Sequence, residues 1–299
     1  MTSEITRRTT LGLIAGAAAL PTGAMAEMLE WDGTTIPKIG MGTWQTFDVP
    51  HRDEAARLER VSILRAFFEA GGRFVDSSPM YGMSEDVLGF CLDRLENTPV
   101  IAASKVWIAQ ADLGAQQIEA SRQLWQLPRL DVVQVHNLLQ YDGHIETLRA
   151  MKAGGDVVKI GISTSHGRRH ADFARIMETE DSLDTVQFTY NIADREAEAR
   201  LLPLAAERGL TVIINRPFRR GALIDRMTGR PLPGFAADIG VKTWPQFFLK
   251  WVISHPAVTV AIPATSKLDH MKENMAAMAG PMPDAAMRRR MVDAFEASA

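Results

Sequence analysis

The sequence predicts an α/β protein in which eight parallel strands and eight helices alternate to form a (β/α)8 TIM barrel. Short, almost continuously apolar segments alternate with longer segments of helical periodicity, which is typical of a parallel sheet covered by helices. Eight strand–helix units follow one another from Lys38, and a chain of 299 residues is long enough for this fold. A doubly wound sheet would carry a G-x-G-x-x-G motif after its first strand, and the segment from Gly40 to Gln45 lacks the third glycine.

The first four units are expected between Lys38 and Lys152. Their strands are short apolar runs, and their helices carry apolar residues at three- and four-residue spacing. Asp112 is expected to cap the third helix. The predicted strands are 38–44, 73–76, 100–105 and 130–136, and the predicted helices are 53–70, 85–95, 112–124 and 145–152.

The last four units show the same alternation. Gly209 is expected to end the sixth helix, and the Gly-, Pro- and Arg-rich segment 216–241 is predicted to be a long loop. The predicted strands are 157–163, 185–188, 210–215 and 258–262, and the predicted helices are 168–177, 196–208, 244–254 and 268–278. Two elements lie outside the units: an N-terminal β-hairpin at 28–36 that turns at Asp32-Gly33, and an extra C-terminal helix at 284–297.

The composition excludes several classes of partner and site. With a net charge of −3 and 23% charged residues, the chain is not expected to bind nucleic acid or an anionic membrane surface. The single cysteine, Cys91, excludes an intrachain disulfide and an all-cysteine metal site. The seven histidines form no H-E-x-x-H motif and no i, i+4 metal pair, so no bound metal is expected.

Residues 1–26 are predicted to be a bacterial twin-arginine signal peptide. The pair Arg7-Arg8 precedes a moderately apolar run at 11–20 that is too short to span a membrane, and 24–26 resembles a cleavage site. Cleavage would leave one barrel domain at 27–299 without a membrane span. The twin-arginine machinery would export this domain, already folded, into the periplasm. The alternative is a disordered basic tail on a cytoplasmic protein.

Four side chains that can hold or transfer protons follow neighbouring strands, at the end where the active sites of such barrels lie. Asp76 and Tyr81 follow the second strand, Lys105 ends the third and His136 ends the fourth. Singly, each has an ordinary interpretation, such as a helix cap, a half-buried tyrosine, a rim ion pair or a core histidine. Together on one rim they predict a proton-transfer site, because such groups are costly to bury without partners.

The chain resembles the aldo-keto reductase family over nearly all of its length after the signal. The matching segments, in the family's order, are 71–85 (GGRFVDSSPMYGMSE), 103–105 (ASK), 130–137 (LDVVQVHN), 160–163 (IGIS), 186–191 (VQFTYN) and 261–274 (AIPATSKLDHMKEN). The resemblance implies reduction of an aldehyde or ketone by hydride from NADPH, and it makes the hairpin a plug at the barrel floor. It implies that Tyr81 is the proton donor, that Lys105 pairs with Asp76 and lowers the tyrosine's pKa, and that His136 orients the carbonyl.

The resemblance also implies a site for NADP, with NAD as the alternative cofactor. Residues 265–267 stand at a helix N-terminus, which suits the 2′-phosphate of NADPH. Ala264 and His270 replace the Lys and Arg of many NADPH-binding members, and Asn215 replaces a common stacking aromatic. The preference between NADP and NAD therefore stays open. It also stays open whether Arg216, or Arg219 and Arg220, contact the pyrophosphate or belong to a solvated basic loop. The residues assigned to the cofactor are Gly42, Thr43, Trp44, Ser163, Thr164, Gln187, Arg216, Thr265, Ser266, Lys267, Glu273 and Asn274.

A substrate pocket is expected from Trp44, Met80, Trp107 and Phe218, which favours a hydrophobic or aromatic carbonyl compound. Two other functions stay open. A non-redox nucleotide-binding sensor or partner protein on the same barrel would fit a compartment with little free nicotinamide cofactor. A Schiff-base lyase would use Lys105 as a nucleophile, but this requires a neutral amine, which the neighbouring acid opposes.

Overall fold

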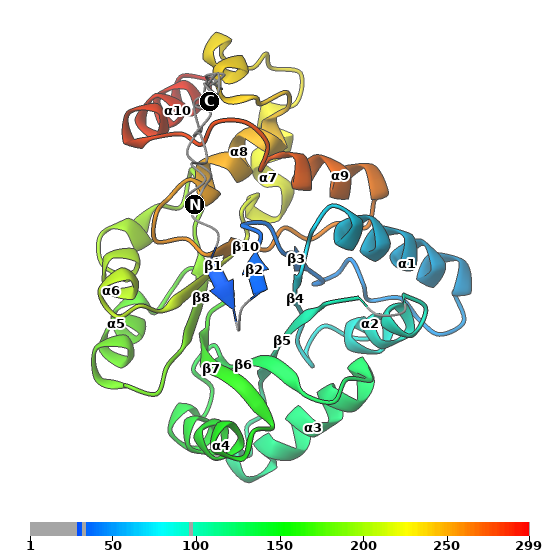
Figure 1. Ribbon diagram of the computed structural model, residues 1–299. Helices are drawn as coiled ribbons and strands as arrows, with labels where there is room; N and C mark the ends of the chain where they lie inside the picture. Colours follow the sequence, from blue (N-terminus) through cyan, green and yellow to red (C-terminus); the bar gives the residue numbers. More distant parts are fainter. Residues whose placement is uncertain (1–28, 32–33, 96–97, 299) are drawn as a thin grey trace, which may run out of the picture.

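The computed structural model describes residues 29–31, 34–95 and 98–298, so the predicted signal peptide lies outside the described residues. Eight parallel strands form one sheet in the order β10-β9-β8-β7-β6-β5-β4-β3, and helices surround it (Figure 1). Isolated parallel bridges from Ile39 to Ala261 and from Gly42 to Ala264 join the two ends of the sheet. The predicted (β/α)8 barrel is therefore confirmed.

The elements alternate along the chain in the predicted order. The strands are β3 Met41–Gly42, β4 Phe74–Asp76, β5 Ile101–Val106, β6 Leu130–His136, β7 Val157–Ser163, β8 Thr185–Thr189, β9 Thr211–Asn215 and β10 Val260–Ala261. The helices that follow them are α1 Glu54–Glu69, α2 Ser84–Asp93, α3 Gly114–Trp125, α4 Tyr141–Gly154, α5 His170–Thr179, α6 Leu201–Glu207, α8 Trp244–Ile253 and α9 Leu268–Ala276. The C-terminal helix is α10 Ala285–Ala297. Among the described residues, no helix is long and apolar enough to cross a membrane.

The parallel register places the last residues of neighbouring strands side by side. Gly42 of β3 pairs with Asp76 of β4, His136 of β6 pairs with Ser163 of β7, and Ser163 pairs with Gln187 of β8. Gly42, Asp76, His136 and Ser163 are the last residues of their strands, and Gln187 lies in the middle of β8. Polar residues that are far apart in the sequence therefore meet on one rim of the barrel.

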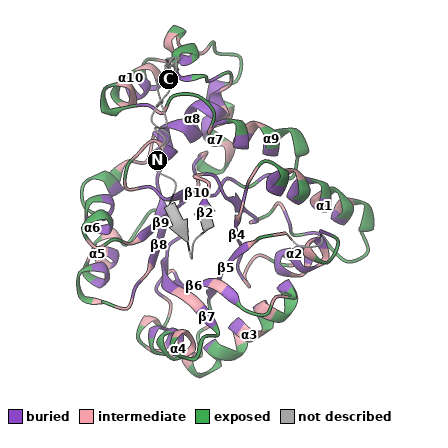
Figure 2. Ribbon diagram, in the orientation of Figure 1, coloured by how far each residue is buried: buried purple, intermediate pink, exposed green. Residues whose placement is uncertain are grey.

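Apolar side chains fill the two sides of the sheet separately. The larger cluster lies between the strands and the helices, whose outward faces are exposed (Figure 2). A smaller cluster combines Ile36 with residues that begin their strands, such as Phe74 and Ile101. Ile36 ends an antiparallel hairpin of β1 Leu29–Trp31 and β2 Thr34–Ile36, so the end of the hairpin packs where the strands begin, opposite their carboxyl ends.

The third, fourth and sixth helices differ from their predicted bounds, and the fourth begins at Tyr141 rather than at 145. Asp112 does not cap the third helix, because it lies within a 3-10 turn at Ala111–Leu113 and α3 begins only at Gly114. The sixth helix is divided, since Arg200, with φ −143° and ψ −47°, separates a short 3-10 turn from α6.

The segment 216–241 is not a long loop. It contains the helix α7 Ala222–Met227 and 3-10 helices at Arg219–Gly221 and Gly234–Ile239. Leu223 and Met227 lie one turn apart and are both buried, so α7 is a short amphipathic helix on the barrel. The arginines and glycines around it obscure this short apolar pattern in the sequence.

Candidate active site

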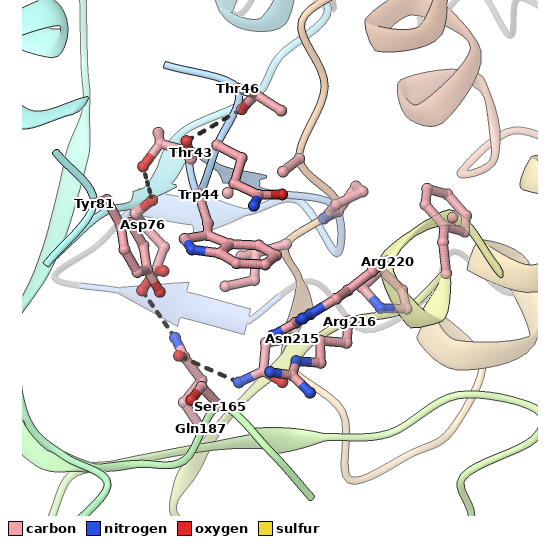
Figure 3. A pocket seen from close by; sticks show the side chains of 18 of the residues that line it. Thr43, Trp44, Thr46, Asp76, Tyr81, Ser165, Gln187, Asn215, Arg216 and Arg220 are labelled. Atoms are coloured by element: carbon pink, nitrogen blue, oxygen red, sulfur yellow. Dashed lines mark hydrogen bonds between the residues drawn. The ribbon is translucent and has the colours of Figure 1, made fainter. Parts of the chain in front are cut away.

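The four candidate catalytic residues meet at the carboxyl end of the barrel strands. Asp76 ends β4, Tyr81 follows it in the next turn, Lys105 lies near the end of β5 and His136 ends β6. Asp76, Tyr81 and His136 line a cavity of about 380 Å³ (Figure 3). The structure thus brings together the residues that the sequence indicated only as members of separate strands.

Lys105 and Asp76 form a buried ion pair beside this cavity. Lys105 Nζ donates to both carboxylate oxygens of Asp76 at 2.8 and 2.7 Å, and to the carbonyl oxygen of Ser77 at 2.7 Å. The side chains are 0% and 3% exposed. Burial alone would lower the pKa of Lys105, but the opposing charges, Asp76 foremost, raise it above its ordinary value. Lys105 is therefore a cation fixed by its ion pair with Asp76. A Schiff-base nucleophile needs a neutral amine, so this geometry does not support that role.

Tyr81 faces this cation. Lys105 Nζ lies 5.2 Å from the centroid of the phenol ring. Burial raises the pKa of Tyr81, and the charge of Lys105 opposes that rise without cancelling it. Lys105 thus lowers the pKa of Tyr81 as expected, but the loss of hydration outweighs this effect and the net shift is upward. The phenol keeps its proton at neutral pH and can act as an acid.

His136 is a neutral imidazole with one nitrogen free. Its side chain is buried, Nδ1 lies 2.8 Å from Ser163 Oγ, and Nε2 has no hydrogen-bond partner among the described residues. Burial, followed by the nearby charge of Lys105, lowers the pKa of His136 to about 3. When the Ser163 hydroxyl donates to Nδ1, the ring proton sits on Nε2. His136 then offers one N–H donor to a ligand in the cavity that it lines.

This lowered pKa predicts a specific loss of stability in acid. The unfolded chain binds a proton at His136 near pH 6.5, whereas the folded chain binds it only near about 3. Protons therefore stabilise the unfolded state, and the free energy of unfolding should fall as the pH drops from 6.5 towards 3. Urea denaturation between pH 7.5 and pH 5 should show a shallower pH dependence for His136→Gln than for the unchanged protein. Equal slopes would contradict a neutral, buried His136.

Glu85 is a buried acid that the sequence analysis did not single out, although it ends the segment that carries Tyr81. It accepts hydrogen bonds from Ser104 Oγ at 2.5 Å, Ser121 Oγ at 2.8 Å and Trp125 Nε1 at 3.2 Å. Burial raises the pKa of Glu85, and these donors oppose the rise. The network ties α2 and α3 to β5, and so fixes the strand that delivers Lys105.

The residues predicted to hold a cofactor fall into three groups. Gly42, Thr43, Trp44, Gln187 and Arg216 line the cavity. Ser163 and Thr164 are fully buried beneath it and do not line it. The residues before and within α9 lie outside this cavity: Thr265, Ser266 and Lys267 precede the helix, and Glu273 and Asn274 lie in its second half.

Several of these groups already have partners inside the protein. Gln187 Nε2 donates to Asp76 Oδ1 at 2.8 Å, and Asn215 Nδ2 lies 3.5 Å from Gln187 Oε1 (Figure 3). Gly42 is required by the fold, because a Cβ there would come within 2.8 Å of the carbonyl oxygen of Ile262, the residue after β10. The polar floor of the cavity is thus a connected network rather than a set of independent groups.

The wall of the cavity contains both apolar and cationic side chains. Trp44, Met80 and Phe218 line it as predicted, whereas Trp107 does not and is 40% exposed. Arg220, which the sequence left open as a pyrophosphate contact or part of a solvated basic loop, lies with its guanidinium 4.4 Å from the centroid of the Trp44 ring. This contact joins the loop after β9 to the loop after β3 across the cavity.

Comparisons with known proteins agree with this geometry. A family model for the aldo/keto reductase family matches residues 38–291. An NADH-specific methylglyoxal reductase of Escherichia coli (strain K12) is 22% identical, over 88% of this chain and 96% of that protein. A pyridoxine 4-dehydrogenase of the same strain is 28% identical, over 81% and 90%. A crystal structure of a Klebsiella pneumoniae aldo/keto reductase in complex with NADP and acetate has a TM-score of 0.73 at 24% identity, covering 87% of this chain and 92% of that one. The chain therefore belongs to the aldo/keto reductase family, a family of oxidoreductases.

Proposed function

We propose that this protein reduces an aldehyde or ketone to an alcohol with hydride from a nicotinamide cofactor, NADPH in the first instance. The observation that carries this proposal is that two groups line one cavity and a third is buried beside it. They are a protonated phenol at Tyr81, a neutral His136 with a free Nε2, and the buried cation Lys105. This set can bind a carbonyl oxygen, protonate it and stabilise the phenolate that remains.

Each residue has a distinct part in the proposed reaction. The bound nicotinamide would supply hydride to the carbonyl carbon. His136 Nε2–H and the Tyr81 hydroxyl donate hydrogen bonds to the carbonyl oxygen and so orient it. As the new C–H bond forms and the C=O π bond opens, Tyr81 gives its proton to the oxygen. Lys105, held by Asp76, stabilises the phenolate until solvent returns a proton to it.

The cavity has chemistry that fits a dinucleotide. Arg216 and Arg220 line it and have no carboxylate partner within ion-pair distance among the described residues, so they are available for phosphate oxygens. His136 Nε2, which has no hydrogen-bond partner among the described residues, can bind a carbonyl oxygen, and the apolar wall at Trp44 can contact an aromatic ring of the ligand. Lys267, exposed just before α9, is the nearest candidate for the 2′-phosphate of NADPH.

NADH is the alternative cofactor. The Escherichia coli relative is described as NADH-specific, and the Klebsiella pneumoniae structure contains NADP. Fluorescence titration should therefore compare the two cofactors directly. If Lys267 determines the preference for NADPH over NADH, Lys267→Ala should weaken NADPH binding about tenfold and leave NADH binding unchanged. The tenfold change corresponds to the loss of one charge-assisted contact.

We further propose that residues 1–26 direct export, so that the folded protein carries its cofactor to the periplasm. The twin-arginine pair at Arg7-Arg8 supports this proposal. Mass spectrometry of nucleotide released from protein isolated from the periplasm should detect NADP or NAD. Recovery of the full-length chain from the cytoplasm alone would contradict export.

Turnover separates the reductase from a non-redox nucleotide-binding protein. Purified protein should oxidise NADPH only when an aldehyde or ketone is added, with one alcohol formed for each cofactor consumed. Nucleotide that binds stoichiometrically but never turns over with any carbonyl compound would favour a sensor or partner protein instead.

A further inference from the structure

The ammonium of Lys105 has as many acceptors as hydrogens. Its three hydrogens point to the two carboxylate oxygens of Asp76, at 2.8 and 2.7 Å, and to the carbonyl oxygen of Ser77, at 2.7 Å. Burial raises the pKa of Tyr81, and Lys105 opposes this rise first through its charge and then through a hydrogen-bonding contribution. The Tyr81 oxygen is therefore a fourth acceptor beside an ammonium that has only three hydrogens.

Asp76 has a second donor, which comes from the middle of β8. Gln187 Nε2 donates to Asp76 Oδ1 at 2.8 Å, so this oxygen accepts hydrogen bonds from both Lys105 and Gln187 (Figure 3). Asp76 and Gln187 are 2% and 1% exposed, so water does not readily replace either donor. Oδ1 is therefore an acceptor that keeps one hydrogen bond when the ammonium of Lys105 turns away from it.

The orientation of the Gln187 amide is fixed by its neighbours. The carbonyl oxygen of Thr164 accepts from Asn215 Nδ2 at 2.7 Å, which identifies the nitrogen of the Asn215 amide. The same nitrogen lies 3.5 Å from Gln187 Oε1. A carboxylate only accepts hydrogen bonds, so Gln187 presents its nitrogen to Asp76 and its oxygen to Asn215. A flipped amide would place two acceptors together at Asp76 and two donors together at Asn215.

We propose that Gln187 is a positioning residue that frees one hydrogen of Lys105 for the Tyr81 oxygen as the proton leaves the phenol. One N–H of Lys105 leaves Asp76 Oδ1 and turns to the phenolate, while the N–H of Gln187 stays on Oδ1. The other two hydrogens of Lys105 keep their bonds to Asp76 Oδ2 and to the carbonyl oxygen of Ser77. Without Gln187, the same movement would leave a buried carboxylate oxygen with no donor, which is costly.

Two buried glutamines of the barrel provide a matched pair of variants. Gln187→Met removes the donor to Asp76 with little change in the size of the side chain. Gln134 on β6 is also fully buried, but its Nε2 donates to Thr185 Oγ1 at 3.0 Å, and it does not line the active-site cavity. Gln134→Met therefore removes a buried amide of the same size away from the Lys105–Asp76 pair, and it is the control.

Ultraviolet titration with base tests the exchange of hydrogen bonds without turnover. The chain has three tyrosines, so the tyrosinate absorbance that is lost when Tyr81→Phe is added to each variant belongs to Tyr81. In Gln187→Met, Tyr81 should ionise at a pH about one unit higher than in the unchanged protein, because its phenolate no longer gains a hydrogen bond from the ammonium. Gln134→Met should match the unchanged protein. Ionisation of Tyr81 at the same pH in Gln187→Met, or an equal change in Gln134→Met, would overturn the proposal.

Turnover then tests the role of the exchange in catalysis, which rests on the proposed reductase function. Gln187→Met should lower kcat for a model aldehyde about tenfold, the rate equivalent of one pH unit, and Gln134→Met should not. In alcohol oxidation the Tyr81 phenolate is the base, so the rise of kcat with pH should move upward by a similar amount in Gln187→Met.

Two outcomes separate this proposal from its alternatives. An effect of Gln187→Met that is confined to NADPH affinity, with kcat and the ionisation of Tyr81 unchanged, would assign Gln187 to the cofactor alone and overturn the proposal. If the unchanged protein reduces no aldehyde or ketone, the reductase function fails, and the titration of Tyr81 still decides whether Gln187 frees a hydrogen of Lys105.

Discussion

Replacing Tyr81 with phenylalanine is expected to lower kcat about a thousandfold, within the range that one general acid contributes. The ring stays in place, so the packing around Lys105 and the affinity for NADPH should be unchanged. The reason is that the phenol proton is the only acidic proton expected beside the carbonyl oxygen at neutral pH, since His136 is neutral and Lys105 is engaged by Asp76. Steady-state kinetics with a model aldehyde, together with NADPH fluorescence titration, measure both quantities.

The control for this variant is His136→Gln, which keeps a hydrogen-bond donor near the carbonyl without an imidazole. It should mainly raise KM, whereas Tyr81→Phe should lower kcat. Turnover by Tyr81→Phe at a rate similar to the unchanged protein would remove Tyr81 from the role of acid.

The second large effect is expected from Lys105→Met. Removal of the ammonium leaves the Asp76 carboxylate, 3% exposed, without its cation, and breaking one partner of a buried pair costs about 3–5 kcal/mol of unfolding free energy. Turnover should fall as well, because the main positive charge that stabilises the Tyr81 phenolate is then lost and only Arg216 contributes. Urea denaturation gives the first quantity and single-turnover kinetics gives the second.

Lys152→Met is a matched control on the same protein. Lys152 pairs with Asp184 at 2.6 Å, but the two side chains are 36% and 26% exposed. Loss of this pair should cost about 1 kcal/mol or less, since solvent screens the charges. The double variant Lys105→Met with Asp76→Asn should recover part of the lost stability, because no unpaired charge remains. Equal costs for Lys105→Met and Lys152→Met would contradict the buried pair.

Much of the barrel could be predicted from the sequence because its parallel strands are continuous apolar runs that end in polar residues. The strands 130–136 and 157–163 lie at the predicted residues for this reason. The same regularity placed Asp76, Lys105 and His136 on one rim, since each ends or nearly ends its strand. The roles of these residues followed from resemblance to a family rather than from the pattern alone.

The errors arise where tertiary contacts decide the outcome. Helix α7 has too few residues for its periodicity to be visible, and it forms because Leu223 and Met227 find a surface to bury them. The expected lowering of the Tyr81 pKa by Lys105 is present, but tertiary burial decides the net direction, which spacing along the chain does not reveal. Trp107 lies next to a catalytic strand, yet its indole is exposed and does not line the cavity.

The residues assigned to the cofactor show another limit of prediction from the sequence. Ser163 was assigned to the nicotinamide by resemblance, and in the structure its hydroxyl lies against His136 Nδ1 beneath the cavity. Such a residue acts on the site through the orientation and tautomer of another side chain. Its position on the strand was predictable, but its partner depends on three-dimensional packing across β6 and β7.

The most direct test of the proposed reductase is a single-turnover reaction with NADPH that carries deuterium at the C4 position of the nicotinamide. Each of the two C4 epimers is mixed with a model aldehyde in its own reaction, and mass spectrometry measures the deuterium content of the alcohol. The account predicts that one epimer delivers one deuterium to the carbonyl carbon, and that Tyr81→Phe slows this delivery without changing which epimer reacts. An alcohol without deuterium from either epimer, or NADPH that stays reduced, would contradict the account.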